Sequence, residues 1–219
     1  MRGRAGPRLR PTWQVAVMAI LTIVALLLAL AIWRSLPHAT TIAGTRVMLD
    51  VPRTWETTDA RQTFDAAWVA EQKRRYPADA ALIDSLIEGL QSGRYAFYAE
   101  IDADRNRTTD GSVLVSVSND GARFDSLRFY ATNSLLLQPV RAREGTATAE
   151  VALPTGPAVR LDWSYALHHA DGTVEIAAVR SYWLIDETRT VVIQLTTYGS
   201  EPAAVADFES VIQAMHWAS

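Results

Sequence analysis

The sequence predicts an α+β fold, an antiparallel sheet with helices packed on it, preceded by one N-terminal transmembrane helix. Residues 13–33 form an apolar run, and after residue 45 the hydrophobic period switches between that of strands and that of helices. The predicted order is strand, two helices, two strands, helix, four strands and helix. The links between successive strands have hairpin length, which is too short for parallel crossovers, so the sheet should be antiparallel.

The apolar run is long enough to cross a bilayer. It carries no charged residue, and only Gln14 and Thr22 interrupt its apolar side chains. As a helix it would extend about 30 Å, the thickness of the hydrocarbon core. Trp13 and Trp33 lie at its ends, where indole rings favour the headgroup layer. We therefore expect contact with the lipid bilayer through residues 13–33.

The charges around this run predict its orientation. Four arginines precede it, and of the basic residues only Arg34 follows closely, so residues 1–12 should form a basic cytoplasmic tail and the C-terminal domain should lie outside the cell membrane. A cleaved signal peptide is the alternative, with Ala29-Leu30-Ala31 as cleavage site. The run is longer than a usual signal peptide core, which favours an uncleaved, single-pass signal-anchor.

Residues 34–44 contain Pro37, Thr40, Thr41 and Gly44 without a helical or strand period, so they are predicted to form a spacer. Residues 45–219 are then one exported, extracytoplasmic α+β domain. Five of the 21 basic residues and none of the 24 acidic ones occur up to Arg34, which leaves a formal net charge of −8 for the rest. This charge argues against nucleic acid as a partner. The absence of cysteine excludes disulfides, thiolate metal sites and cysteine nucleophiles.

The first part of the domain should contain a strand and two helices, followed by two more strands. Apolar and polar residues alternate from residue 46 up to Pro52, which indicates a strand. Asp59 can cap the first helix, and the apolar stripe of the second helix runs from Leu82 to Leu90 and ends near Gly93. Two half-buried strands follow at residues 95–101 and 112–117. Asn119-Asp120-Gly121 then offers a turn and a cap for a helix whose inward residues would be Phe124, Leu127, Ala131 and Leu135.

The last third is predicted to be a meander of four strands and a final helix. The strands are expected at residues 147–153, 159–167, 174–185 and 191–197. Asp171-Gly172 is typical of a tight hairpin turn because both residues tolerate positive φ. Ser200 should cap the last helix, which has Pro202 in its first turn and one apolar face, formed by Val205, Phe208, Ile212 and Met215.

Two short motifs and the C-terminal helix resemble those of the PsbP-like fold family. The motifs are Val47-Met48-Leu49-Asp50-Val51-Pro52-Arg53-Thr54-Trp55 and Val151-Ala152-Leu153-Pro154-Thr155-Gly156-Pro157-Ala158-Val159-Arg160, and the helix is residues 207–217. The family includes small exported bacterial proteins, and the Ala- and Arg-rich composition here is also typical of a bacterium. The resemblance implies a protein that binds or stabilises other proteins, with no reaction chemistry attached.

No metal site is predicted. Asp102, Asp104, Asn106 and Asp110 have the early spacing of a calcium loop, but Arg107 replaces its glycine and Val113 its bidentate glutamate. His168 and His169 are adjacent, so in a strand they would point to opposite faces and could not coordinate the same metal ion. They should lie at a hairpin tip.

Catalytic motifs are also missing from the sequence, and no catalytic, cofactor-binding or metal-binding residue is assigned. Glu100, Asp162 and Glu175 could meet across the sheet, although such carboxylates usually face solvent. Most of the large aromatic residues are expected in the core. Tyr182 and Trp183 must face opposite ways, so one of them is a candidate for a contact surface.

The sequence thus predicts a membrane-anchored extracytoplasmic binding or accessory module that contacts a cell-envelope protein, without enzymatic activity and without a cofactor. Two alternatives remain open at this stage. One is a hydrolase that uses carboxylates with His168 or His169 and would need a concave pocket. The other is a small-ligand sensor domain, although the cytoplasmic tail has no room for an output domain.

Overall fold

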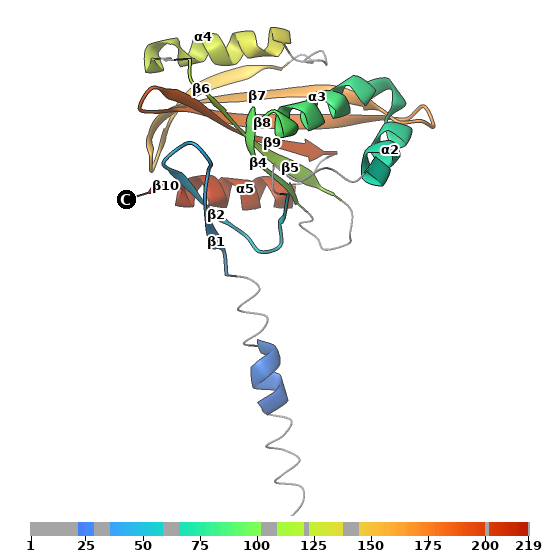
Figure 1. Cartoon of the computed structure of the whole chain (residues 1–219), viewed down its shortest axis with the longest axis horizontal. Helices are drawn as coiled ribbons and strands as arrows, with labels where there is room; N and C mark the ends of the chain where they lie inside the picture. Colours follow the sequence, from blue (N-terminus) through green and yellow to red (C-terminus); the bar gives the residue numbers. More distant parts are fainter. Residues whose placement is uncertain are drawn as a thin grey trace, which may run out of the picture. The chain divides into compact units, whose positions relative to one another are not determined.

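The computed structural model describes residues 22–28, 36–58, 66–101, 109–120, 123–137, 145–199 and 202–218 (Figure 1). The chain divides into two compact units, residues 1–37 and 38–219. In the first unit, residues 22–28 are helical and their side chains are exposed. None of the helices in the described ranges has the length and apolar character needed to cross a membrane. The remainder of the predicted span 13–33 lies outside these ranges.

The second unit contains ten strands, four α-helices and two short 3₁₀ helices within the described part of the chain. The strands are β1 (His38–Thr41), β2 (Val47–Val51), β3 (Glu56–Thr58), β4 (Tyr95–Ile101), β5 (Gly111–Ser118), β6 (Ala147–Leu153), β7 (Gly156–His168), β8 (Val174–Asp186), β9 (Arg189–Tyr198) and β10 (His216–Trp217). The helices are α2 (Ala66–Arg75), η1 (Pro77–Asp79), α3 (Ala80–Gln91), α4 (Phe124–Ser134), η2 (Leu135–Leu137) and α5 (Pro202–Ala214).

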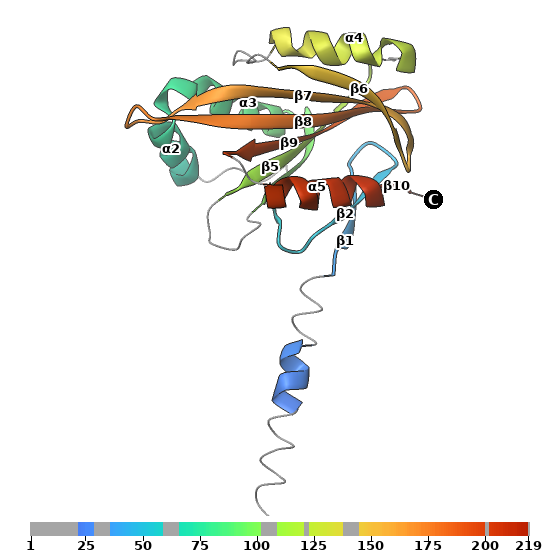
Figure 2. The same cartoon turned by 180° about the vertical axis from the view of Figure 1, so that it is seen from behind.

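The strands form two antiparallel sheets. The large sheet has the order β3-β4-β5-β9-β8-β7-β6, and the small one has the order β1-β2-β10. Strands β6 to β9 are the predicted meander, and β9 returns to pair with β5 along its whole length, from Gly111 opposite Thr197 to Ser118 opposite Thr190. The predicted α+β fold with an antiparallel sheet and packed helices is confirmed for this unit (Figures 1 and 2).

One face of the large sheet is covered by α5 and the small sheet (Figure 2). Alternate residues of β5 and β9 point to this face, and Phe208 and Ile212 of α5 are fully buried against them. On the same face, the Tyr182 hydroxyl lies 2.8 Å and 2.9 Å from the two carboxylate oxygens of Glu209 on α5. Arg180 also binds Glu209, at 2.9 Å. Apolar packing and the hydrogen bonds of Glu209 with Tyr182 and Arg180 together hold α5 on the sheet.

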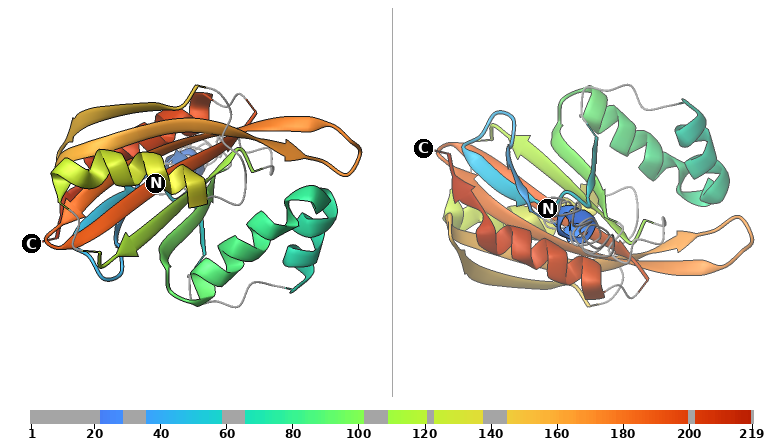
Figure 3. Two further views of the ribbon diagram at one scale, coloured as in Figure 1. Left: turned by 90° about the horizontal axis from the view of Figure 1, so that it is seen from above. Right: turned by 90° about the horizontal axis from the view of Figure 1, so that it is seen from below.

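The opposite face carries α4 and the α2–α3 pair, which lie over different parts of the sheet (Figure 3). Leu127 and Ala131 of α4 are completely buried against β7 and β8, as their predicted inward positions require. Where α4 begins, the Arg123 backbone N–H donates a hydrogen bond of 3.3 Å to the Ser126 hydroxyl. The predicted cap at Asn119-Asp120-Gly121 is therefore wrong, because the helix starts after Arg123 and closes its first turn with a serine.

Two further predictions need correction. The predicted spacer contains strand β1, which pairs with β2 from His38 opposite Val51 to Thr41 opposite Met48, and Ile42 just after it is 1% exposed. Pairing with β2 stabilises a segment that lacks a strand pattern of its own. The hairpin predicted at Asp171-Gly172 is present, because β7 pairs with β8 up to His168 opposite Val174. Its link is a five-residue loop in which Gly172 adopts φ +86°, as expected, whereas Asp171 does not have positive φ and instead accepts the Thr173 N–H at 2.9 Å.

Candidate functional site

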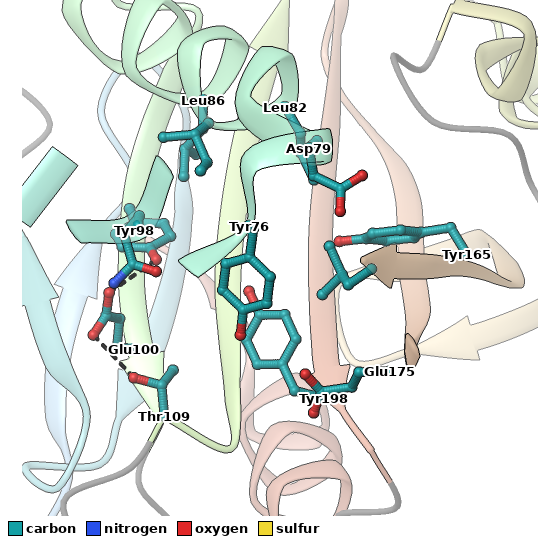
Figure 4. Close-up of a pocket in the computed structure, with 13 residues that line it drawn as sticks. Tyr76, Asp79, Leu82, Leu86, Tyr98, Glu100, Thr109, Tyr165, Glu175 and Tyr198 are labelled. Carbon is teal, nitrogen blue, oxygen red and sulfur yellow. Dashed lines mark hydrogen bonds between the residues drawn. The ribbon is translucent and has the colours of Figure 1, made fainter. Parts of the chain in front are cut away.

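A cavity of about 160 Å³ lies on the second face of the sheet, below η1 and α3 (Figure 4). We call it the tyrosine pocket. Strands β4, β7, β8 and β9 supply its floor, because alternate residues of each strand point to this side. Its lining consists of Gln72, Tyr76, Asp79, Leu82, Ile83, Leu86, Tyr98, Glu100, Thr109, Tyr165, Leu167, Glu175 and Tyr198.

Four tyrosines, three from different strands and one from the link before η1, turn toward this cavity (Figure 4). Tyr76 precedes η1, and the other three come from β4, β7 and β9. Burial raises the pKa of Tyr98 and of Tyr165, and it also raises the pKa of Tyr198. These three side chains are therefore neutral phenols at physiological pH, because a low-dielectric surrounding disfavours the phenolate.

The Tyr165 hydroxyl points into the tyrosine pocket (Figure 4), and no hydrogen bond joins it to any of the described residues. Its side chain is only 6% exposed. A phenolic hydroxyl can donate one hydrogen bond and accept another. The pocket thus contains a polar group that a ligand can satisfy.

Three carboxylates line the same cavity. Asp79, 8% exposed, accepts the His168 backbone N–H at 2.8 Å, which ties η1 to the end of β7. Glu100 accepts hydrogen bonds from the hydroxyls of Tyr98 at 3.2 Å and Thr109 at 3.3 Å. Glu175 Oε2 lies 3.0 Å from His169 Nε2. Each carboxylate is therefore oriented by a neighbour, and the three come from separate elements.

The tyrosine pocket is negatively charged. Its described lining contains no Lys, Arg or His. His169 lies beside the cavity, where its Nε2 is 3.0 Å from Glu175 and its ring centroid is 4.8 Å from that of Tyr76. Two opposite charges attract strongly at a partly buried site, because the effective dielectric constant there is far below that of water. Tyrosine ring faces add to the attraction of a cation. The pocket is suited to bind a positively charged group.

A second cavity of about 430 Å³, which we call the sheet groove, lies between α3 and α4 on the same face. Leu82, Leu86, Tyr98, Tyr165 and Tyr198 line both cavities. The floor of the sheet groove is made by the middle strands of the sheet and includes Ser112, Leu114, Ser116, Trp163, Ser181, Trp183, Val192 and Gln194. The two cavities are neighbours with a common wall.

The fold brings together only some of the residues that the sequence singles out. Glu100 and Glu175 meet in the tyrosine pocket, whereas Asp162 lies on the other face, bound by Arg180 at 2.7 Å. His168 is the last residue of β7 and His169 the first of the β7–β8 loop, and the side chain of His168 is 55% exposed. Of the aromatic neighbours in β8, Tyr182 is buried under α5 while Trp183, half-buried, lines the sheet groove.

The calcium-loop residues Asp102, Asp104 and Asn106 lie outside the described ranges, whereas Asp110 is 5% exposed. Among the residues that the structure describes, no three His, Cys, Asp or Glu side chains are placed to hold a metal ion. Sequence reasoning missed Asp79, Tyr76 and Tyr198 as site residues. No motif marks them, and only the sheet order brings them together.

Comparisons with known proteins give structural neighbours but no family. No family model and no curated protein matches the sequence. The Saccharomyces cerevisiae Ran-binding protein Mog1p superposes with a TM-score of 0.46 at 9% identity, over 83% of this chain and 95% of that one. LpqN, involved in cell envelope biogenesis of Mycobacterium tuberculosis, gives a TM-score of 0.36 at 14% identity, over 56% of this chain and 72% of its own.

A cyanobacterial PsbP from Synechocystis is also among the neighbours. It superposes with a TM-score of 0.38 at 13% identity and covers 84% of this chain and 93% of its own. A protein of the PsbP-like fold family, which the sequence motifs resemble, is thus among the structural neighbours.

Proposed function

We propose that the protein is a membrane-anchored extracytoplasmic binding module, and that its tyrosine pocket captures a lysine or arginine side chain of a cell-envelope protein partner. One observation carries this proposal: three carboxylates and four tyrosines surround a single cavity whose described lining has no cationic residue. The unpartnered Tyr165 hydroxyl in the same cavity adds a polar group that a ligand can satisfy.

Electrostatics favours a cation over other ligands. An anion would meet three carboxylates, and an apolar ligand would displace water from them without offering a charge in return, which is costly. A cationic side chain gains charge-assisted hydrogen bonds, which are roughly twice as strong as neutral ones. The net charge of −8 on residues 35–219 would also attract a basic partner over a longer range.

The geometry gives binding more support than hydrolysis. A hydrolase would need a general base and a nucleophile within reach of one another. The tyrosines with raised pKa are poor bases, and Thr109, the only aliphatic hydroxyl among the described lining residues, bonds to Glu100. The His169–Glu175 pair is the feature that keeps a hydrolase as the second candidate.

Zero-length crosslinking in native membranes tests the proposal. A carbodiimide joins a carboxylate to a lysine amine that touches it, so the partner should be recovered through Glu100 or Glu175 and identified by mass spectrometry. A matched control is Glu150→Gln, which neutralises an exposed carboxylate on β6. We expect the double variant Glu100→Gln, Glu175→Gln to lose the crosslinked partner and the control to keep it.

Two results would count against the proposal. If the double variant recovered the same partner as the unaltered protein, contact would occur elsewhere and the tyrosine pocket would not be the site. If no envelope protein were crosslinked and free lysine or arginine derivatives did not bind the purified chain, the cation-binding function itself would be wrong.

A further inference from the structure

The tyrosine pocket and the sheet groove adjoin on one face of the sheet, and we call the two cavities together the binding channel. Five residues line both cavities, and three of them, Tyr98, Tyr165 and Tyr198, come from strands of the same sheet face. Their rings therefore form the boundary between the two cavities. A ligand that enters the tyrosine pocket has the sheet groove directly beyond these rings.

The sheet groove differs from the tyrosine pocket in charge. No carboxylate is among its described lining residues, and Arg94 is its only charged one. Arg94 lies at an outer position and pairs with Glu88 at 3.5 Å. The interior of the groove is therefore uncharged, whereas the adjoining pocket carries three acidic groups.

Some polar side chains on the floor of the groove already form hydrogen bonds with neighbouring protein groups. The Ser181 hydroxyl accepts the indole N–H of Trp183 at 3.0 Å and lies 3.4 Å from the Leu161 carbonyl oxygen. Ser181 is 2% exposed and Ser112 is 8% exposed. The surface that remains open to a ligand includes apolar and aromatic side chains, among them Leu114 and Val192.

We infer that the ligand of this channel is an amphipathic organic cation. Its ammonium or guanidinium group binds among Asp79, Glu100 and Glu175, and its uncharged stem extends past Tyr98 and Tyr165 into the sheet groove. The inference rests on the cation site of the proposed function and adds to it a place for the apolar part of the ligand. A lysine side chain in an apolar sequence and a free alkyl amine share this chemistry.

The length of the ligand's uncharged stem can be varied to test whether the stem binds in the sheet groove. Each methylene group that leaves water on binding should raise affinity roughly fourfold. The probes are n-alkylammonium ions from ethyl to hexyl, with the matching alcohols as uncharged controls. Calorimetry on the full chain in lipid nanodiscs, with empty nanodiscs subtracted, gives each affinity. We expect a steady gain with chain length for the ammonium ions and much weaker binding of the alcohols.

A variant separates the two parts of the channel. Ser116 is half-buried, lines the sheet groove and does not line the tyrosine pocket. Ser116→Phe should fill the groove and abolish the gain with stem length while ethylammonium binds as before. The control is Ala152→Phe, which adds the same ring at an exposed position of β6 outside both cavities and should leave the whole series unchanged.

Each outcome decides a different point. Equal affinity for all ammonium ions would overturn the channel and leave the cation site standing. Equal affinity for ammonium ions and alcohols would overturn the cationic head, and with it the proposed function. If a lysine peptide with blocked ends binds more tightly than butylammonium, the inference is supported and the natural ligand is a protein side chain. If hexylammonium binds more tightly than the peptide, the inference is supported and the natural ligand is a free amine.

Discussion

The hydrogen bond between Tyr182 and Glu209 offers a test of how α5 is held on the sheet. Tyr182→Phe removes only the hydroxyl, which donates a hydrogen bond to the Glu209 carboxylate. Tyr182 itself is 3% exposed. A hydrogen bond to a charged group contributes about 1.5–3 kcal/mol. Because Glu209 keeps its bond to Arg180, we expect the lower value, about 1.5 kcal/mol, which corresponds to a fall of about 3–6 °C in the midpoint of thermal unfolding.

The pH dependence makes this prediction more specific. Burial and the bond to Glu209 raise the pKa of Tyr182 from 10.0 to about 12. A group whose pKa is raised in the folded state stabilises it fully below the unfolded pKa and loses that effect as the pH rises through the folded value. The difference in unfolding free energy between the unaltered protein and Tyr182→Phe should therefore be constant below pH 10.0 and shrink between pH 10.0 and about 12.

Denaturant unfolding followed by circular dichroism across this pH range measures the difference. Tyr130→Phe is the matched control, because Tyr130 is 44% exposed on α4, and it should unfold like the unaltered protein at every pH. The reasoning is refuted if Tyr182→Phe is as stable as Tyr130→Phe at neutral pH, or if the gap stays constant up to the highest pH.

Three further changes test the packing. Phe208→Ala should cost about 3–5 kcal/mol in denaturant unfolding, because the ring is 0% exposed; a loss below 1 kcal/mol would mean that α5 is not part of the core. Gly111→Ala should lower the unfolding midpoint sharply, since its Cβ would lie 2.7 Å from the Thr196 carbonyl oxygen, and an unchanged midpoint would contradict the β5–β9 register. Trp217→Ala removes a hydrogen bond of 3.0 Å to the Thr155 carbonyl and should speed proteolysis of the C-terminus, whereas equal cleavage rates would argue against β10.

Local patterns in the sequence were sufficient to predict most elements. The meander strands and α3 follow from hydrophobic periods, because each segment buries one face. Strand β1 has no such period. Its four residues form a strand because they pair with β2, the next strand in the sequence. The third strand of this sheet, β10, comes from the other end of the domain, and such a long-range pairing leaves no local signal.

The candidate site depends on the same kind of long-range information. Tyr165 was expected in the core from its strand position, which describes its burial but not the cavity in front of its hydroxyl. Asp79 belongs to a three-residue helix between α2 and α3, too short to show a period. Glu100 and Glu175 could be paired only by knowing the order β4-β5-β9-β8, and hydrophobic alternation does not encode which strands are neighbours.

The position of β2 has a consequence for how the domain acquires its structure in the cell. Val47, Leu49 and Val51 are completely buried in the core that α5 covers, and β2 also pairs with β10. A ribosome releases β2 well before α5, so these three side chains stay without this cover until residues 202–214 have been made. An early strand of the domain is thus among the last parts to be enclosed, and a chain truncated before residue 202 would leave apolar β2 side chains open to chaperones and proteases.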